Sequence, residues 1–222
     1  MTIQEMHVLF RTLGQAMGLQ LVRAILPESI DTYLNDAIVD TVRKIVLGNS
    51  TMQFQDKVTI QNDTISPINA IRTLYKRNEI DLSFEDKLPI HLRTENLTNV
   101  MYFCSFALSY GDGRYIKCRF IEPDKVEDTN ADYCNRASVA YPIVTMFDDN
   151  GMIIEIQNGT TNKLPQVLLI RYIENPAIVH LDDNEDLCVD CNLPDYLHHE
   201  IVETAVQKYF SSVGSTSQSI QS

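Results

Sequence analysis

The residues of this 222-residue chain best suited to chemistry lie near its C-terminal end. Cys188 and Cys191 have the spacing of half a zinc site, and His198 and His199 follow them. A structural zinc ion needs four ligands, usually from two such pairs. The sequence contains no second CxxC pair, so we expect no bound zinc. A redox pair belongs in a βαβ setting, which the pattern of this chain does not predict.

A run of carboxylates with no base among them precedes these residues and comprises Asp182, Asp183, Glu185, Asp186 and Asp190. Acidic clusters can bind Mg²⁺ or Ca²⁺, but an EF-hand loop requires Gly at its sixth and Glu at its twelfth position. Neither requirement is met here, which favours a solvated acidic loop. A metal-assisted hydrolase that uses this cluster stays open as an alternative.

Other catalytic patterns are absent from the sequence. It contains no G-x-S-x-G motif, and its eight glycines are scattered in turns rather than gathered in a phosphate-binding loop. We therefore expect no catalytic residue, no cofactor and no metal site, and we do not expect an enzyme.

Charge further restricts the class of partner. Acidic residues number 30 and basic residues 18, which gives a net charge of −12. Residues 1–90 hold 11 acidic and 9 basic side chains, whereas residues 91–222 hold 19 and 9. Tight binding to phosphate backbones needs clustered Lys and Arg, so specific nucleic-acid binding is not expected. No uncharged stretch is long enough for a membrane-spanning helix, and the odd number of cysteines, five, suits a reducing compartment.

Hydrophobic spacing of three to four residues predicts the helices that position these groups. In the second of them, Pro27 suits the first helical position and Gly48 suits a left-handed stop. Ser66 and Pro67 suit the start of the third. The predicted helices are 3–22, 27–47, 66–78 and 194–210, and residues 211–222 have the composition of a mobile tail.

The period changes to two from about residue 88, which predicts strands. Gly111-Asp112-Gly113 predicts a hairpin turn between two of them. The order helices, strands, helix predicts an α+β protein. We expect a helical bundle core, made by the N-terminal helices and the C-terminal helix, with an inserted antiparallel β-sheet region. The expected domains are 1–87 with 183–213, then 88–182, and a flexible tail over 214–222.

Helix 27–47 has an apolar stripe wider than one neighbour requires. Ile30, Leu34, Ile38 and Val42 form one line, and Tyr33, Ala37 and Thr41 form the line beside it. Because a small domain needs only one such face covered, we expect the second line to meet another subunit. Tyr33, Ala37 and Thr41 are therefore the candidate subunit interface.

Two segments resemble a known group of proteins. The first contains Pro27-x-x-Ile30-Asp31-x-Tyr33-Leu34-Asn35-x-Ala37. The second runs from Arg171-Tyr172 and Pro176 to Cys191-Asn192-Leu193-Pro194-Asp195-x-Leu197-His198-x-Glu200-Ile201-Val202-x-x-Ala205-Val206. Together they resemble virion structural proteins of tailed bacteriophages, especially the crAss-like group. Asn192 stands where that group has Asp.

The resemblance implies a head-to-tail connector, also called an adaptor or ring protein. Such a protein forms rings, commonly twelve-fold, below the portal protein and beside other neck or tail proteins. It seals the neck, and the genome DNA passes through its channel without specific binding. The resemblance thus implies location in the virion neck, and in the host cytoplasm during assembly. An interaction module that forms no ring remains an alternative.

Overall fold

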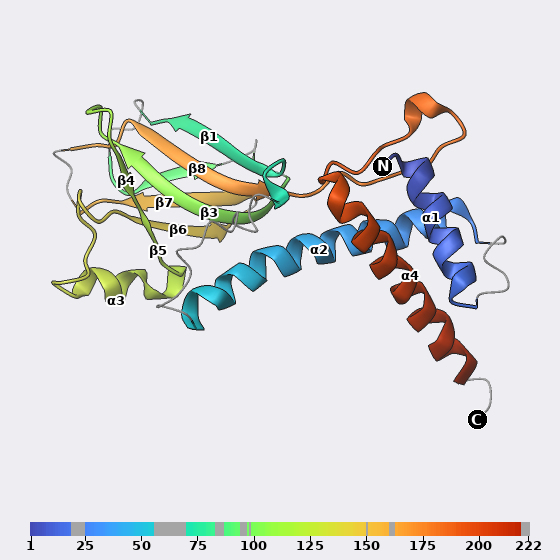
Figure 1. Cartoon of the computed structure of the whole chain (residues 1–222). Helices are drawn as coiled ribbons and strands as arrows, with labels where there is room; N and C mark the ends of the chain where they lie inside the picture. The colour runs from blue at the N-terminus through green and yellow to red at the C-terminus, as the bar shows by residue number, and fades with distance from the viewer. Residues whose placement is uncertain are drawn as a thin grey trace. The chain divides into compact units, whose positions relative to one another are not determined.

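The computed structural model describes residues 1–18, 25–55, 70–82, 87–93, 97, 99–149, 151–159 and 163–218. The chain divides into two units, which Figure 1 shows with their helices and strands. We call Met1–Leu74 with Asn175–Ser222 the helical unit, and Tyr75–Glu174 the sheet unit. The protein is therefore mixed α+β, as the sequence predicts.

Helix α1 (Ile3–Ala16) begins with a capping box. The Thr2 side chain accepts from the backbone N–H of Glu5, whose own side chain accepts from the N–H of Thr2. The helix ends earlier than predicted because Gly18 adopts a φ of 93°, a conformation that terminates helices. Residues 19–22, the rest of the predicted helix, lie outside the described residues.

Helices α2 (Pro27–Gln55) and α4 (Asp195–Gln218) contact each other, and α1 contacts both. Figure 1 shows α4 crossing α2. Apolar side chains at helical spacing fill the core between the three helices, because each helix must bury its apolar stripe against another element. The fully buried ones include Met6, Phe10, Ile30, Leu34, Ile38, Val42, Ile201, Val202 and Ala205.

Both of the long helices continue past their predicted ends. Gly48 does not terminate α2, since a glycine inside a helix costs only about 1 kcal/mol. Residues 211–218, predicted to be a mobile tail, belong to α4, and 219–222 lie outside the described residues. No helix in the described parts of the chain has both the length and the apolar composition needed to cross a membrane.

The sheet unit contains two four-stranded sheets, with the strand orders β1-β8-β3-β4 and β2-β7-β6-β5. Their strands are β1 (Tyr75–Asp81), β2 (Ile90–Arg93), β3 (Val100–Ser109), β4 (Tyr115–Lys117), β5 (Arg119–Phe120), β6 (Ile143–Asp148), β7 (Met152–Gln157) and β8 (Val167–Glu174). Between β5 and β6 lie the short helices η3 (Pro123–Lys125) and α3 (Val126–Ala131). Residues 122–135 are thus partly helical.

The two sheets pack face to face and share one core. Buried side chains from both contribute to it, among them Ile90, Phe106, Leu108, Val144, Ile154, Ile156, Leu168 and Ile170. The predicted hairpin at Gly111-Asp112-Gly113 is confirmed, because β3 and β4 pair as antiparallel neighbours on either side of it. The prediction of a single antiparallel sheet is wrong. The described strands form two sheets, and β5 pairs with β6 in parallel.

The predicted helix 66–78 is also wrong where the structure describes it. Residues 66–69 lie outside the described residues, and Tyr75 begins β1. All seven residues of β1 pair with β8, from Tyr75 opposite Ile173 to Asp81 opposite Val167. Non-local pairing therefore overrides the helical spacing, and the sheet unit starts at 75 rather than 88.

The C-terminal boundary of the sheet unit also differs from the predicted position, 182. The sheet unit ends at Glu174, and the segment from Asn175 onward belongs to the helical unit. A turn of helix, η4 (Glu185–Leu187), interrupts this segment before α4 begins. The polar contacts of this segment with α2 place the segment in the helical unit. The same contacts form the centre of the candidate site.

Candidate functional site

Asp31 joins three separate parts of the helical unit. It lies on α2 with only 5% of its surface exposed. Its Oδ1 accepts a hydrogen bond from Nε2 of His7 on α1 at 2.7 Å. Its Oδ2 accepts from Nδ1 of His180 at 3.0 Å and from the backbone N–H of Leu181 at 3.1 Å. A buried carboxylate is thus compensated by donors from two elements other than its own helix.

Burial sets the protonation of His7. The imidazole is buried, and desolvation lowers its pKa below the ordinary value, although the bond to Asp31 opposes this shift. The ring is therefore neutral at pH 7, with its proton on Nε2 facing the carboxylate. Among the described residues, Nδ1 of His7 has no hydrogen-bond partner.

Asn35, one turn after Asp31, binds the same incoming segment. Its Nδ2 donates to the carbonyl of Val179 at 3.0 Å, and its Oδ1 accepts the N–H of Val179 at 2.8 Å. Residues 179–181 are therefore fixed to α2 by two side chains spaced four apart on one helix face. This pairing gives a structural reason for the Asp31-x-x-Leu34-Asn35 spacing.

Hydrogen bonds also fix the residues just before α4 and the start of α1. Nε2 of His198 donates to the carbonyl of Leu193 at 2.8 Å, and Asp190 accepts the backbone N–H of Ile3 at 2.7 Å. His198 is 2% exposed and therefore lies inside the helical unit. His199 is exposed, and its Nε2 lies 3.2 Å from a carboxylate oxygen of Glu203. The two adjacent histidines therefore have different environments.

The candidate interface residues Tyr33, Ala37 and Thr41 do not form an open surface. Ala37 is fully buried and Thr41 is 4% exposed in the single chain. The ring of Tyr33 packs edge-on against Tyr209 of α4, and its hydroxyl bonds Oγ of Ser212 at 2.8 Å. The second apolar line of α2 is therefore covered within the same chain, and a neighbouring subunit would need another surface.

Charges supplement the contact between α2 and α4. Nζ of Lys208 lies 2.7 Å from Oδ2 of Asp36 and also pairs with Asp40. This lysine holds the pKa of the Asp40 carboxyl below its usual value, chiefly through the hydrogen bond between them. One cation thus bridges two carboxylates that lie one turn apart on α2.

Cys188 and Cys191 have different settings, and both are free thiols. Cys188 Sγ lies 3.4 Å from the N–H and from the carbonyl of Asp182, which makes it part of the loop structure. Burial raises the pKa of the Cys191 thiol, so it is poorly suited to act as a thiolate. No described group of three or more His, Cys, Asp and Glu residues is arranged to hold a metal ion. The expected absence of zinc stays a prediction.

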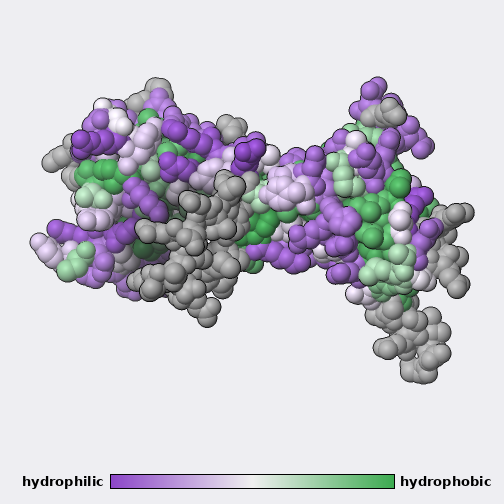
Figure 2. Space-filling view, viewed as in Figure 1, coloured by the Kyte–Doolittle hydropathy of each residue, from purple (hydrophilic) through white to green (hydrophobic). Residues whose placement is uncertain are grey.

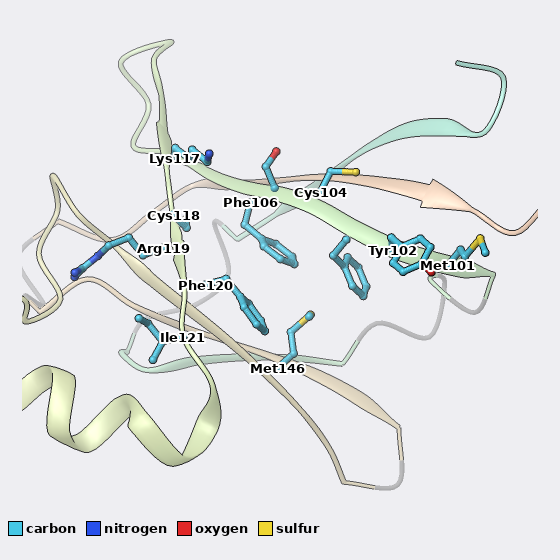
Figure 3. A pocket seen from close by; sticks show the side chains of 12 residues that line it. Met101, Tyr102, Cys104, Phe106, Lys117, Cys118, Arg119, Phe120, Ile121 and Met146 are labelled. Atoms are coloured by element: carbon cyan, nitrogen blue, oxygen red, sulfur yellow. The ribbon is translucent and has the colours of Figure 1, made fainter. Parts of the chain in front are cut away.

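The sheet unit contains a cavity of about 890 Å³ between β3, the β4–β5 segment and β6. In Figure 3, the rings of Phe106 and Phe120 and the side chain of Met146 point toward one another across this space. The guanidinium of Arg119 points away and donates to the carbonyl of Asn135. Cys118, also on the wall, is buried, and desolvation raises its pKa to about 12. The wall of the cavity is therefore largely apolar, and the Cys118 thiol on it is poorly suited to act as a thiolate.

Sequence reasoning missed both the Asp31 cluster and this cavity. A signal for His7 was present, because it lies four residues after Ile3 and three before Phe10, and this helical spacing puts it on the buried face of α1. His180 offered no such signal, because its partner lies 149 positions away. The cavity depends on where two strands stop pairing, which local sequence does not specify.

No protein-family model and no curated protein matches this chain.

Proposed function

We propose that this chain is a virion structural protein of a tailed phage, a ring-forming head-to-tail connector below the portal. The support is the role of the residues that carry the resemblance. Asp31 and Asn35 each make a contact that joins α2 to residues 179–181, and His198 bonds the carbonyl of Leu193 at the start of α4. The first resembling segment and residues 176–206 of the second therefore meet in one structural unit, as they should if the resemblance reflects a shared fold.

The proposed architecture is a helical bundle core with the sheet unit as its insertion. In this arrangement the helical unit packs between neighbours in the ring. Tyr33, Ala37 and Thr41 are replaced as the interface by apolar side chains that a neighbour can reach. Figure 2 shows hydrophobic atoms gathered over α1 and α4 on the face in view. Val8 on α1 and Tyr196 on α4 are 66% and 68% exposed.

Net charge bears on the proposed passage of DNA. Each contact between a basic side chain and a phosphate adds affinity, so a channel that lets DNA slide benefits from a surface with few such contacts. The chain carries 12 more acidic than basic residues. It therefore suits a neck component that surrounds the genome without binding it, with the portal and neighbouring neck or tail proteins as its partners.

Particle composition tests the proposal. Purified virions should contain this chain in stoichiometric amounts, measurable by quantitative mass spectrometry. A neck reconstruction by electron cryo-microscopy should then show it as a closed ring of about twelve copies, since closed rings form from head-to-tail interfaces. A neck without this chain would rule out the connector function.

Two substitutions test the revised interface. Val8→Glu and Tyr196→Glu should each abolish incorporation into particles, because an unpaired carboxylate buried between subunits is strongly unfavourable. Tyr133→Glu is the matched control, since Tyr133 is 79% exposed and lies in the sheet unit. Far-ultraviolet circular dichroism establishes that all three variants fold. Normal incorporation of both helical-unit variants would exclude these side chains from the interface.

A further inference from the structure

One side of β3 is covered over only part of its length. β4 pairs with Ala107–Ser109. Cys118, the residue that follows β4, donates its N–H to the carbonyl of Phe106 at 2.9 Å. The chain then leaves this sheet and enters the other one as β5. Within the described ranges, no strand pairs with residues 100–105 of β3 on that side. Their backbone groups therefore form an open sheet edge.

The facing sheet has a matching open edge. β5 pairs with Ile143 and Val144 of β6, and Ile121 adds one bond to the carbonyl of Val144 at 3.0 Å. Beyond that point, residues 145–148 have no strand neighbour on this side among the residues that the structure describes. The chain thus passes from one sheet to the other through a single residue, Cys118. Beyond this residue the edge of β3 and the edge of β6 are both open.

The 890 Å³ cavity lies along the open edge of β3. Its wall includes every residue from Met101 to Phe106. Side chains of a strand alternate between its two faces, so a wall made of consecutive residues is the edge of the strand rather than one face. Phe103 and Phe106, whose ring centroids lie 5.5 Å apart, line the interior with Phe120.

We propose that this cavity binds an extended segment of another protein, which adds to β3 as a strand. The backbone of such a segment would pair with the open edge, and every second side chain would enter the space between the sheets. An edge of about five residues spans roughly 16 Å at 3.3 Å per residue. The segment should therefore carry two or three apolar side chains at alternate positions.

Charge defines the segment further. The described residues that line the cavity include two bases, Lys117 and Arg119, and no carboxylate, although acidic residues predominate in the chain as a whole. Arg119 is engaged with backbone carbonyls, whereas Lys117 is exposed at the rim. An acidic side chain between the apolar ones would meet this lysine. A segment that alternates apolar and acidic residues is complementary to the site.

A peptide fits better than a lipid chain, although the volume suits either ligand. The open edge presents backbone donors and acceptors along its length, and a strand can satisfy both, whereas an alkyl chain satisfies neither. The inference does not depend on the connector function, since it rests on the sheet unit alone.

The probe is a fluorescein-labelled eight-residue peptide that alternates valine and glutamate, titrated with the full chain and followed by fluorescence anisotropy. We expect saturable binding. Methylation of alternate peptide nitrogens should weaken it at least tenfold, because it removes the donors that pair with β3. A peptide that alternates valine and lysine should also bind at least tenfold more weakly.

Substitutions locate the binding site. Phe120→Glu should weaken binding of the valine–glutamate peptide at least tenfold, since Phe120 lines the cavity and is 51% exposed, so the fold can tolerate the change. Tyr141→Glu is the matched control, because Tyr141 is 66% exposed in the same unit and does not line the cavity. This variant should bind as the unchanged chain does.

Four results would overturn the proposal. They are no binding at millimolar protein, equal affinity for the methylated and unmethylated peptides, displacement of the peptide by dodecanoate that binds more tightly, and self-association of the chain that Phe120→Glu abolishes. The third would indicate a lipid site and the fourth a second copy of this chain. Absence of the chain from virions would exclude the connector function and leave the peptide result unaffected.

Discussion

At the scale of single residues, Asp31 has the largest role in stabilising the fold that we can assign. Its carboxylate accepts three hydrogen bonds from parts of the chain that are far apart in sequence. We expect Asp31→Asn to lower the free energy of unfolding by about 2–4 kcal/mol, because an amide cannot accept all three bonds and leaves buried donors without partners. Urea unfolding measures the change.

The control for this substitution is Asp186→Asn, in the exposed acidic loop. It should change the free energy of unfolding by less than about 0.5 kcal/mol, as surface substitutions usually do. An equal effect of the two variants would mean that the net charge, and not the Asp31 cluster, determines the stability.

His7 gives the helical unit a dependence on pH. Its pKa in the folded chain is lowered by burial, so the unfolded chain takes up a proton first as the pH falls. This contribution to stability is complete above the ordinary value of about 6.5 and is lost as the pH falls from there toward the folded pKa. Stability should therefore decrease between pH 7.5 and 5.

His7→Gln isolates this effect, because glutamine still offers an N–H to Asp31 but does not titrate. We expect the variant to be less stable at pH 7.5, since the imidazole packing is lost, and to show a shallower pH dependence. Urea midpoints measured at intervals of half a pH unit provide the test. Parallel curves for the two proteins would show that groups other than His7 cause the pH dependence.

Single residues also show the limit of sequence reasoning. The pair Asp31 and Asn35 stood out as a motif, yet the segment that it holds, at Val179 and Leu181, had no recognisable signal. Hydrogen bonds across 144 and 150 positions depend on the tertiary fold. The sequence placed Tyr33, Ala37 and Thr41 on one line of the helix, but it could not show that this line is covered within the same chain.

At the scale of elements, the contact between α2 and α4 combines packing with charge. Lys208→Met should lower the free energy of unfolding by up to about 1 kcal/mol, because it leaves Asp36 and Asp40 facing each other without a cation. High salt should reduce the difference, since it screens exposed charges. Thermal unfolding at low and high sodium chloride concentration measures both effects.

Lys87→Met serves as the control, because Lys87 is exposed and belongs to neither long helix. Its unfolding temperature should match that of the unchanged chain at both salt concentrations. If Lys208→Met behaves in the same way, the α2–α4 contact depends on apolar packing alone.

The elements also differ in how well sequence predicted them. The start of α2 follows from Pro27 and a continuous apolar stripe, both of which are local features. β1 was mistaken for helix, because Ile71, Leu74 and Tyr75 recur at helical spacing. Its pairing with β8, about 90 positions later, decides its conformation, and no local pattern encodes that contact.

At the scale of the whole molecule, the two units have separate cores. Buried side chains from both sheets form one cluster within Tyr75–Glu174. A fragment of these residues should therefore fold alone and unfold cooperatively, because a domain with its own core needs no other unit. Dispersed amide signals in a nitrogen–proton NMR spectrum would show this, and a collapsed spectrum would show that the helical unit is required.

The pairing of Tyr75 with Ile173 has a consequence for the order of folding. The helical unit must bring together two segments separated by about 100 residues, and closing a flexible loop of that length costs about 4 kcal/mol in chain entropy. Once β1 has paired with β8, the two ends of the insertion are neighbours, and the remaining closure resembles that of a loop of about four residues, near 1 kcal/mol. An insertion that folds first thus lowers the entropic cost of bringing together the two segments of the helical unit. It also allows one inserted unit to be exchanged for another during evolution, provided that the new one keeps its ends together.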